Sequence, residues 1–346
     1  MANKLGPFAI IGAGVGLLLV ARRLTQHPSA PSFEGKVVLI TGGSRGLSYA
    51  LAEEFARQGA RIAICARHEH ELHAAYQKLT PRGVELFTVQ CDVTKQEQVQ
   101  AMVEQVTAHY GAIDVLVNDA GIITIGPLEA QTQQDFEDSM NVMFWGAYYT
   151  TMAVLPQMMA RQEGHIVNIT SIGGKVSVPH LLSYASAKFA FVGFSEGLFA
   201  ALDKHSISVT TVVPGLMRTG SAINATAKGN HQAEYTWFSI ADSLPLITVS
   251  ADKAAKQIVK ATRQKKAEIT LTLAAKALAK FHGLFPGLTC HILAFVNRVL
   301  PASDSPQGLE PRSGKESETP LTQSFLTTLS QKAANKYNEH ADMQPG

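Results

Sequence analysis

Short apolar runs alternate with helical patterns along most of the chain, and this alternation predicts the fold. Runs typical of buried strands are Val37–Ile40, Arg61–Cys65, Glu85–Gln90, Ile113–Asn118, His165–Thr170, Ser208–Val213 and, as a candidate seventh, Glu268–Thr272. The segments between them predict helices that end near Gln58, cover Glu69–Leu79, Gln96–Tyr110 and Thr132–Ala160, or end near Lys204. Continuous apolar strands separated by helices predict an α/β fold with a parallel sheet covered on both faces. Right-handed crossovers then make the sheet doubly wound.

The alternation extends over residues 35–272, which we assign to a single domain. Within it, Gly220–Leu244 interrupts the rhythm and predicts either a substrate lid or a plain surface excursion. An apolar helical extension with scattered cations follows at 273–300, where Gly283 and Pro286 should divide it into two helices. A second membrane contact, a wall of the substrate pocket and a dimer surface are three open interpretations of this extension.

An apolar segment also precedes the domain. Residues 1–24 contain Leu5–Ala21, which is uncharged and is followed directly by Arg22–Arg23. This length reaches the lower end of the range for a membrane span, so we predict an N-terminal membrane anchor. A linker over 25–34 joins it to the domain. A cleaved signal peptide and a soluble hydrophobic arm remain alternatives, although the arginine pair stands where a cleavage site should lie. The arginines favour a catalytic domain on the cytoplasmic side.

The composition separates a globular chain from a polar C-terminus. Hydrophobic residues make up 46% and charged residues 17% of the 346, which is typical of a globular protein. The formal net charge of +2 gives no reason to expect a nucleic acid partner. Residues 301–346 are polar and rich in Pro, Ser and Glu, which predicts a disordered tail with at most a short helix near Leu321–Lys336.

Three cysteines, Cys65, Cys91 and Cys290, are the only ones in the chain. No pair has the spacing of a zinc site, so we predict no bound metal. An odd and sparse set also argues against a disulfide framework and favours a reducing compartment.

A glycine-rich turn, Thr41–Leu47, follows the first predicted strand and opens the first predicted helix. Gly42 and Gly46 allow the backbone to turn tightly and to approach a phosphate closely. The start of the helix then offers free N–H groups and a partial positive charge. The turn therefore predicts a phosphate-binding loop for a nucleotide cofactor.

A second constellation lies in the stretch Ser171–Lys188. Tyr184 and Lys188 are four positions apart in a helical pattern, so their side chains lie on one face. A cation beside a phenol favours the phenolate, and we therefore expect the pKa of Tyr184 to fall below its usual value. Ser171 stands at the C-terminal end of a predicted strand, where the active sites of open α/β sheets form. The pattern predicts a proton donor and acceptor.

These motifs make the chain similar to the short-chain dehydrogenase/reductase family, over about Phe33–Thr219, which implies a Rossmann fold. The matching segments are the loop Thr41–Ser48, Asn118-Asp119-Ala120-Gly121, the catalytic Ser171, Tyr184 and Lys188, and Pro214-Gly215 with Thr219 behind it. Two residues depart from the family pattern. Ser48 replaces the third loop glycine and is expected to crowd the helix against the cofactor, and Asp119 replaces an asparagine.

The resemblance implies a role for each catalytic residue. Tyr184 resembles the general acid and base that acts on the reacting oxygen. Lys188 would lower the pKa of Tyr184 and hold the nicotinamide ribose, and Ser171 would hydrogen-bond the carbonyl oxygen. Asn141 falls where the family has a fourth catalytic residue, which supports a water that relays protons toward Lys188. A helix-interior amide that only satisfies backbone groups is the alternative for Asn141.

The choice of cofactor is predicted from two arginines. NAD-binding folds of this type usually place an acidic residue after the second strand, and here that strand runs into Ala66 and Arg67. With Arg45 in the loop, two guanidinium groups suit a 2′-phosphate, which predicts NADP(H). The expected cofactor contacts are Gly42, Ser44, Arg45, Gly46, Leu47, Arg67, Asp92, Val93, Asn118, Ala120, Gly121, Tyr184, Lys188, Pro214, Gly215 and Thr219.

The sequence thus predicts an NADP(H)-dependent oxidoreductase that interconverts a carbonyl and a secondary alcohol at a membrane. The apolar extensions suggest a lipid, steroid or retinoid-like substrate, and a soluble reductase of small carbonyl compounds is the nearest alternative. A non-catalytic NADP(H)-binding regulator or scaffold is an alternative of another class, and the intact Ser, Tyr and Lys set argues against it. The family resemblance also implies a homodimer or homotetramer.

Overall fold

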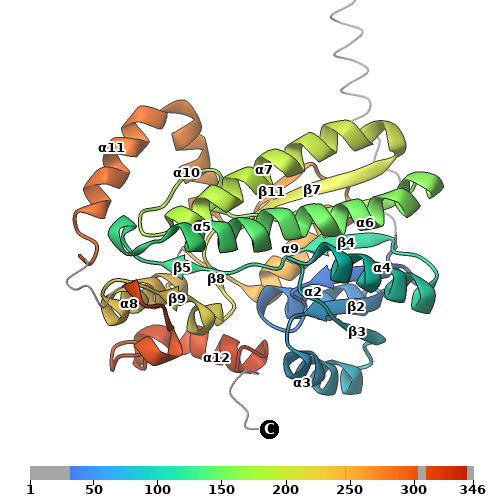
Figure 1. Ribbon diagram of the computed structural model, residues 1–346, viewed down its shortest axis with the longest axis horizontal. Helices are drawn as coiled ribbons and strands as arrows, with labels where there is room; N and C mark the ends of the chain where they lie inside the picture. Colours follow the sequence, from blue (N-terminus) through green and yellow to red (C-terminus); the bar gives the residue numbers. More distant parts are fainter. Residues whose placement is uncertain (1–31, 246, 303–308, 341–346) are drawn as a thin grey trace, which may run out of the picture. The chain divides into compact units, whose positions relative to one another are not determined.

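The computed structural model describes residues 32–245, 247–302 and 309–340 (Figure 1). The predicted anchor, Leu5–Ala21, lies outside these residues. Within them, one helical segment, Leu182–His205, has the length and composition of a membrane span. It contains α7 (Leu182–Leu202), which carries Tyr184 and packs against the central sheet. This packing explains the apolar composition of the helix.

The central sheet contains seven strands in the order β11-β7-β6-β4-β1-β2-β3. Their bounds are β1 Val37–Thr41, β2 Arg61–Ala66, β3 Leu86–Gln90, β4 Val115–Asn118, β6 Gly164–Ile169, β7 Ile207–Val213 and β11 Glu268–Thr270. Every neighbouring pair is parallel. The order runs outward from β1 in both directions, which confirms the predicted doubly wound Rossmann-type sheet.

Side chains of β1 alternate between two apolar cores because successive residues of a strand point to opposite faces. Val38 and Ile40 belong to a core that includes residues of α2 (Gly46–Arg57) and α9 (Ala251–Arg263). Val37 and Leu39 belong to the opposite core, which includes residues of α4 (Gln96–Tyr110) and α6 (Gly146–Arg161). Burial of each such side chain contributes about 1.5–3 kcal/mol, so the two cores hold the strands in register.

The single helix predicted over Thr132–Ala160 is divided in the structure. It consists of α5 (Gln133–Met140), a π-helical turn at Asn141–Trp145, and α6. A π turn takes more residues than an α turn, so it changes which side chains face the core after Met140. Hydrophobic periodicity therefore predicts the helical extent correctly but not the orientation of Asn141.

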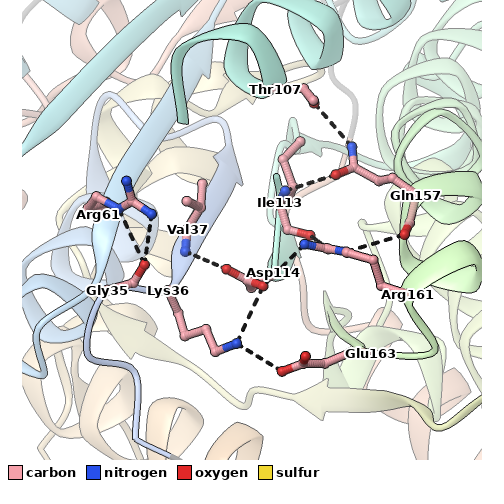
Figure 2. A network of polar contacts seen from close by, with 10 residues as sticks. All are labelled: Gly35, Lys36, Val37, Arg61, Thr107, Ile113, Asp114, Gln157, Arg161 and Glu163. Atoms are coloured by element: carbon pink, nitrogen blue, oxygen red, sulfur yellow. Dashed lines mark hydrogen bonds and ion pairs between the residues drawn. The ribbon is translucent and has the colours of Figure 1, made fainter. Parts of the chain in front are cut away.

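A polar network joins the N-terminal ends of β1 and β4 to the end of α6 (Figure 2). Asp114 accepts a hydrogen bond from the N–H of Val37 at 2.9 Å and lies 3.6 Å from the ammonium of Lys36. Lys36 also pairs with Glu163 at 2.8 Å, and Arg161 donates to the Ile113 carbonyl at 2.6 Å. The network satisfies backbone groups at the edge of the sheet opposite the predicted site.

The C-terminal residues 309–340 are folded, so the predicted disorder is wrong for this part of the tail. β12 (Arg312–Ser313) pairs with β9 (Thr226–Ala227), which also pairs with β5 (Thr124–Ile125). A short helix, α12 (Thr328–Lys336), packs on α8 (His231–Ser243). Polar composition misled the prediction because serine and threonine side chains bond within the segment, as Thr327 does to the Thr322 carbonyl at 2.6 Å.

The apolar extension forms two helices, as predicted. α10 (Leu273–Leu284) ends at Phe285, and α11 (Pro286–Asn297) begins with the proline. The hydroxyl of Thr272 caps α10 by accepting a bond from the N–H of Ala275. The outer faces are unusually exposed for apolar helices, with Leu284 at 74% and Phe295 at 66% of full exposure. The remaining longer helix of the domain, α3 (Glu69–Leu79), follows β2.

The predicted interruption at Gly220–Leu244 contains α8, which is joined to the loop before α7 by buried hydrogen bonds. Glu234 on α8 contacts the ring Nδ1 of His180 at 2.8 Å and accepts from the indole N–H of Trp237 at 2.8 Å. Both Glu234 and His180 are buried. A buried carboxylate with two polar partners is expensive to remove because its partners then lose their hydrogen bonds.

We therefore expect Glu234→Ala to lower the free energy of unfolding by about 1–3 kcal/mol, because the buried groups left behind lose their hydrogen-bond partner. Chemical denaturation followed by tryptophan fluorescence measures the change. Glu129→Ala, at an exposed position, is the matched control and should change stability by less than about 0.5 kcal/mol. Equal stability of the two variants would show that the His180–Glu234 contact does not hold α8 in place.

Candidate active site

The C-terminal ends of the parallel strands border one large cavity of about 1000 Å³. The chain after β1 contributes the glycine loop, the chain after β4 contributes Asp119–Gly121 and the chain after β6 contributes Ser171, while α7 contributes Tyr184 and Lys188. The parallel direction of the strands brings these segments to the same edge of the sheet. Residues of α8 and α10 also line the cavity, so the Gly220–Leu244 insertion forms part of its wall.

The glycine loop has the tight geometry that its sequence predicts. Gly42 and Gly46 have φ values of +67° and +63°, which favour glycine. A Cβ on Gly42 would stand 3.0 Å from the Cα of Ala120, so the loop touches the segment after β4. The hydroxyl of Thr41 joins the same two segments by accepting bonds from the N–H groups of Asp119 at 3.1 Å and Ala120 at 3.2 Å. The residues present therefore form a close-packed turn at the start of α2, as a dinucleotide phosphate requires.

The two departures from the family pattern contact each other. The Ser48 hydroxyl donates a hydrogen bond to the Asp119 carboxylate, and Ser48 is buried. Burial raises the pKa of Asp119 to about 6, while the bond from Ser48 and the charge of Lys188 act in the opposite direction. The Ser48 hydroxyl is thus a hydrogen-bond donor to the Asp119 carboxylate. These two residues stand where the family pattern has a glycine and an asparagine.

The side chain of Asn118 is fully engaged inside the protein. Its amide donates to Asn168 at 2.9 Å and to Thr151 at 3.1 Å, and its carbonyl oxygen accepts from the Thr150 hydroxyl at 2.6 Å. These bonds join β4, β6 and α6. Asn118 is also the one predicted cofactor contact that does not line the large cavity. Sequence reasoning missed Asn168 and Thr150, because no local pattern marks partners that come from separate elements.

Ser171, Tyr184 and Lys188, the predicted catalytic trio, line the same cavity. Ser171 caps a short turn after β6, where its hydroxyl accepts from the N–H of Gly173 at 3.0 Å. A Cβ on Gly173 would stand 3.4 Å from the Ser171 hydroxyl and 3.1 Å from the Tyr184 ring, so glycine allows the two to approach. Lys188 is buried beneath them, and its ammonium donates to the Ile169 carbonyl at 2.9 Å.

The expected fall in the pKa of Tyr184 is wrong. Burial raises this pKa to about 12, and the Ser171 hydroxyl counteracts only part of the effect. Burial also lowers the pKa of Lys188 to about 8, although the charge of Asp119 raises it. The Lys188 ammonium lies 5.7 Å from the centre of the Tyr184 ring and donates to a backbone carbonyl. Desolvation of the phenol therefore outweighs the attraction that helical spacing suggests.

Asn141 does not line the large cavity that Ser171, Tyr184 and Lys188 line. It is exposed and lines a second, smaller cavity with Arg67 and Asp92. Met143, two residues later, is fully buried, and its sulfur lies 3.7 Å from where a Cβ on Gly121 would stand. A π turn begins at Asn141, and hydrophobic periodicity carries no signal for such a turn.

The other predicted cofactor residues line the large cavity, namely Gly42, Ser44, Arg45, Gly46, Leu47, Arg67, Asp92, Val93, Ala120, Gly121, Tyr184, Lys188, Pro214, Gly215 and Thr219. Two acidic residues that sequence reasoning missed lie beside the loop. Glu71 accepts from the Ser44 hydroxyl at 2.5 Å and pairs with Arg45 at 3.3 Å. Glu339, from the folded tail, also lines the cavity. Among the described residues, no group of His, Cys, Asp and Glu has the arrangement of a metal site.

The fold is that of a known enzyme class. The sequence profile described as short chain dehydrogenase matches residues 36–230. The chain belongs to the short-chain dehydrogenase/reductase family, whose members are oxidoreductases acting on CH–OH and C=O groups. The fold binds NAD or NADP.

Two relatives illustrate the range of similarity. SadH of Mycobacterium tuberculosis is 35% identical over 250 residues, which are 71% of this chain and 90% of SadH. Estradiol 17-beta-dehydrogenase 11 of Macaca fascicularis is 33% identical over 192 residues, which are 55% of this chain and 64% of the relative.

Solved structures give the same family. A short-chain dehydrogenase/reductase from Burkholderia phymatum, in complex with NAD, has a TM-score of 0.69 at 25% identity and covers 75% of this chain and 96% of its own. A gluconate 5-dehydrogenase from Burkholderia cenocepacia, in complex with NADP and tartrate, has a TM-score of 0.62 at 25% identity. The match covers 72% of this chain and 99% of the dehydrogenase. Both cofactors therefore occur among structures similar to this one.

The Ser48–Asp119 contact leads to a test by double-mutant cycle. Ser48→Ala removes the donor and leaves a buried carboxylate, so we expect a loss of about 1–3 kcal/mol in the free energy of unfolding. Asp119→Asn should lower the free energy of unfolding by less, and the double variant should recover most of the loss that Ser48→Ala causes. Denaturant titration of all four proteins measures the coupling.

The pH dependence provides the control for this cycle. A carboxyl group with a folded-state pKa of about 6, above the ~3.9 of an unfolded aspartate, binds more protons in the folded state. Its stabilising effect is therefore present below about pH 4 and is lost as the pH rises through 6. The cost of Ser48→Ala should be larger at pH 8 than at pH 5, and a pH-independent cost would contradict the assignment.

Proposed function

We propose that this protein is an NADP(H)-dependent oxidoreductase that interconverts a carbonyl and a secondary alcohol on an apolar substrate. The observation that carries the proposal is the convergence of Ser171, Tyr184 and Lys188 on a cavity that the glycine loop also lines. The dinucleotide, when bound, supplies or accepts the hydride. The residues of the chain handle the proton and the developing charge.

The raised pKa of Tyr184 suits it to donate a proton in the reductive direction. With a pKa of about 12, the phenol is protonated at neutral pH and can give its proton to the oxygen of the reacting carbonyl. Ser171 hydrogen-bonds the same oxygen and favours the negative charge that develops there. Lys188, with a pKa of about 8, is still largely charged at pH 7 and holds that charge beside the phenol. In the oxidative direction the same proton returns to Tyr184.

Tyr184→Phe should lower turnover by at least about 10²–10⁴-fold, the usual contribution of a general acid, and leave cofactor affinity unchanged. Steady-state reduction of an apolar ketone and fluorescence titration with NADPH measure the two quantities. Tyr76→Phe, an exposed tyrosine, is the matched control and should behave as the wild type. Retained turnover in the Tyr184 variant would refute the role. Tight cofactor binding by a wild type that reduces no ketone would favour the regulator alternative.

The preference for NADP(H) rests on Arg67. β2 ends at Ala66, and the exposed Arg67 follows where a family member that prefers NAD would carry a carboxylate. Arg67 lines both the large and the small cavity, so its guanidinium can reach a 2′-phosphate at the adenosine end. Arg45 is paired with Glu71, which reduces its share in this preference.

Arg67→Ala should weaken NADPH binding by about tenfold or more, the effect of losing a charge-assisted bond, and leave NADH binding unchanged. Fluorescence titration with each dinucleotide provides the measurement. Arg298→Ala, an exposed cation on the C-terminal side of α11, controls for the loss of net charge. Equal affinities of the wild type for NADPH and NADH would remove the basis of the proposed preference.

The apolar substrate class is supported by the cavity wall. The wall of the large cavity includes the hydrophobic residues Val178, Leu181, Leu216, Trp237, Phe238, Ile247 and Leu278. Such a wall suits a lipid, steroid or retinoid-like carbonyl compound. The name of the relative estradiol 17-beta-dehydrogenase 11 points to the same class.

Membrane association and self-association complete the proposal. The apolar segment Leu5–Ala21 would anchor the chain, with the catalytic domain on the cytoplasmic side. The exposed apolar faces of α10 and α11 lie on the same helical extension that lines the cavity, which would place the substrate entrance near lipid. Exposed apolar residues on α6 and α7, such as Met152 and Phe189, are compatible with a homodimer or homotetramer.

A further inference from the structure

The end of the folded tail lies directly on the glycine loop. We call Tyr337–Glu339 the C-terminal arm. α12 ends before it, and Asn338 has a φ of +62°, the left-handed conformation that turns a chain away from a helix. The N–H of Glu339 donates back to the Ala334 carbonyl at 3.0 Å. This turn directs the arm into the large cavity instead of along the surface.

Backbone and side-chain bonds hold the arm against the loop. The N–H of Gly46, at the start of α2, donates to the Tyr337 carbonyl at 2.8 Å. The Asn338 amide donates to the Ser44 carbonyl at 2.9 Å, and its oxygen accepts from Lys78 at 2.8 Å. The arm thus uses a donor at the helix start, where such N–H groups bind anions.

The side chain of Glu339 continues the same contact with a negative charge. It is only 1% exposed, and one carboxylate oxygen accepts from Asn224 at 2.7 Å and lies 3.8 Å from the guanidinium of Arg45. The other oxygen has no hydrogen-bond partner and stands 2.6 Å from where a Cβ on Gly46 would be. An unpartnered, buried carboxylate oxygen is therefore aimed at the loop that should receive a phosphate.

The charges around Glu339 make its position costly. Burial raises its pKa to about 7, Arg45 and Asn224 lower it, and the carboxylates of Glu71 and Asp242 raise it further. Two negative charges about 5 Å apart repel by about 3 kcal/mol at an effective dielectric constant of 20. A pyrophosphate at the start of α2 and the Glu339 carboxylate therefore exclude each other on both steric and electrostatic grounds.

We propose that the C-terminal arm is an autoinhibitory element that occupies the phosphate site of the dinucleotide and must leave before the cofactor binds. The arm competes with the pyrophosphate, which NAD and NADP share. The proposal rests on dinucleotide binding by the fold and is independent of the preference for NADP(H) and of the substrate.

Glu339→Gln in the full chain tests the competition. The amide keeps the size of the side chain and its bond to Asn224 but removes the charge, so the affinities for NADPH and NADH should both rise, by about tenfold or more. Fluorescence titration measures them. Glu310→Gln, an exposed glutamate of the same tail, is the matched control and should leave both affinities unchanged. Unchanged or weaker binding of both dinucleotides by the Glu339 variant would overturn the proposal.

A second variant, at position 338, distinguishes release of the whole arm from an effect of the Glu339 side chain alone. Asn338→Gly fits the left-handed conformation and removes the bonds to Ser44 and Lys78, so it should loosen the arm and also tighten both dinucleotides. If both arm variants tighten binding but NADPH and NADH bind equally well, the arm proposal stands and the NADP(H) preference fails. If NADPH binds preferentially and neither variant changes its affinity, the NADP(H) preference stands and the arm proposal fails.

Hydrogen exchange observes the movement itself. Backbone amides over residues 332–340, including the Glu339 N–H bonded to Ala334, should exchange faster when NADPH or NADH is added at saturation. Slower exchange, together with weaker binding by Glu339→Gln, would mean that the arm closes over the bound cofactor as part of its site. That outcome would overturn the autoinhibitory role and make the arm part of the cofactor site.

Discussion

All seven strands of the central sheet run in the same direction, and the site depends on that constraint. Their C-terminal ends fall on one edge, where the chain must leave each strand and return through a helix. Backbone groups beyond the last ladder bonds need partners there, and Thr41 supplies them by binding the N–H groups of Asp119 and Ala120. The network around Asp114 meets the same need at the opposite edge. The edge at the C-terminal ends of the strands can therefore carry glycine turns and polar side chains, while the two cores of the sheet remain apolar.

Burial then decides the chemistry of the charged groups along this edge. Tyr184, Asp119 and Glu339 all have raised pKa values, because each loses water and gains few compensating partners. Lys188 responds in the opposite sense, with a pKa of about 8. Residue types suggest which groups exchange protons, but the direction of each shift follows from the packing around them. For this reason the helical spacing of Tyr184 and Lys188 identifies the pair and still misjudges the pKa of the phenol.

The folded tail joins segments that are far apart in the sequence at the glycine loop. α12 packs on α8 in the insertion after β7, and the C-terminal arm contacts the loop after β1. The positions joined in this way, such as Asn338 and Ser44, are almost 300 residues apart in the sequence. A polar segment of this composition would remain disordered if it were isolated, because it buries little apolar surface of its own. It folds here because its serine and threonine side chains bond internally and Tyr337 is buried against the domain.

The sequence by itself determined the parallel fold, the phosphate loop and the residues Ser171, Tyr184 and Lys188, because each depends on local patterns with a regular period or a fixed spacing. The tertiary structure alone decided three other features. Asn141 begins a π turn and lines the smaller cavity, Ser48 donates a hydrogen bond to Asp119, and the tail places Glu339 on the glycine loop. Each of these depends on the orientation of a side chain or on a contact between distant segments. Composition and periodicity contain no information about either, since they describe only neighbours along the chain.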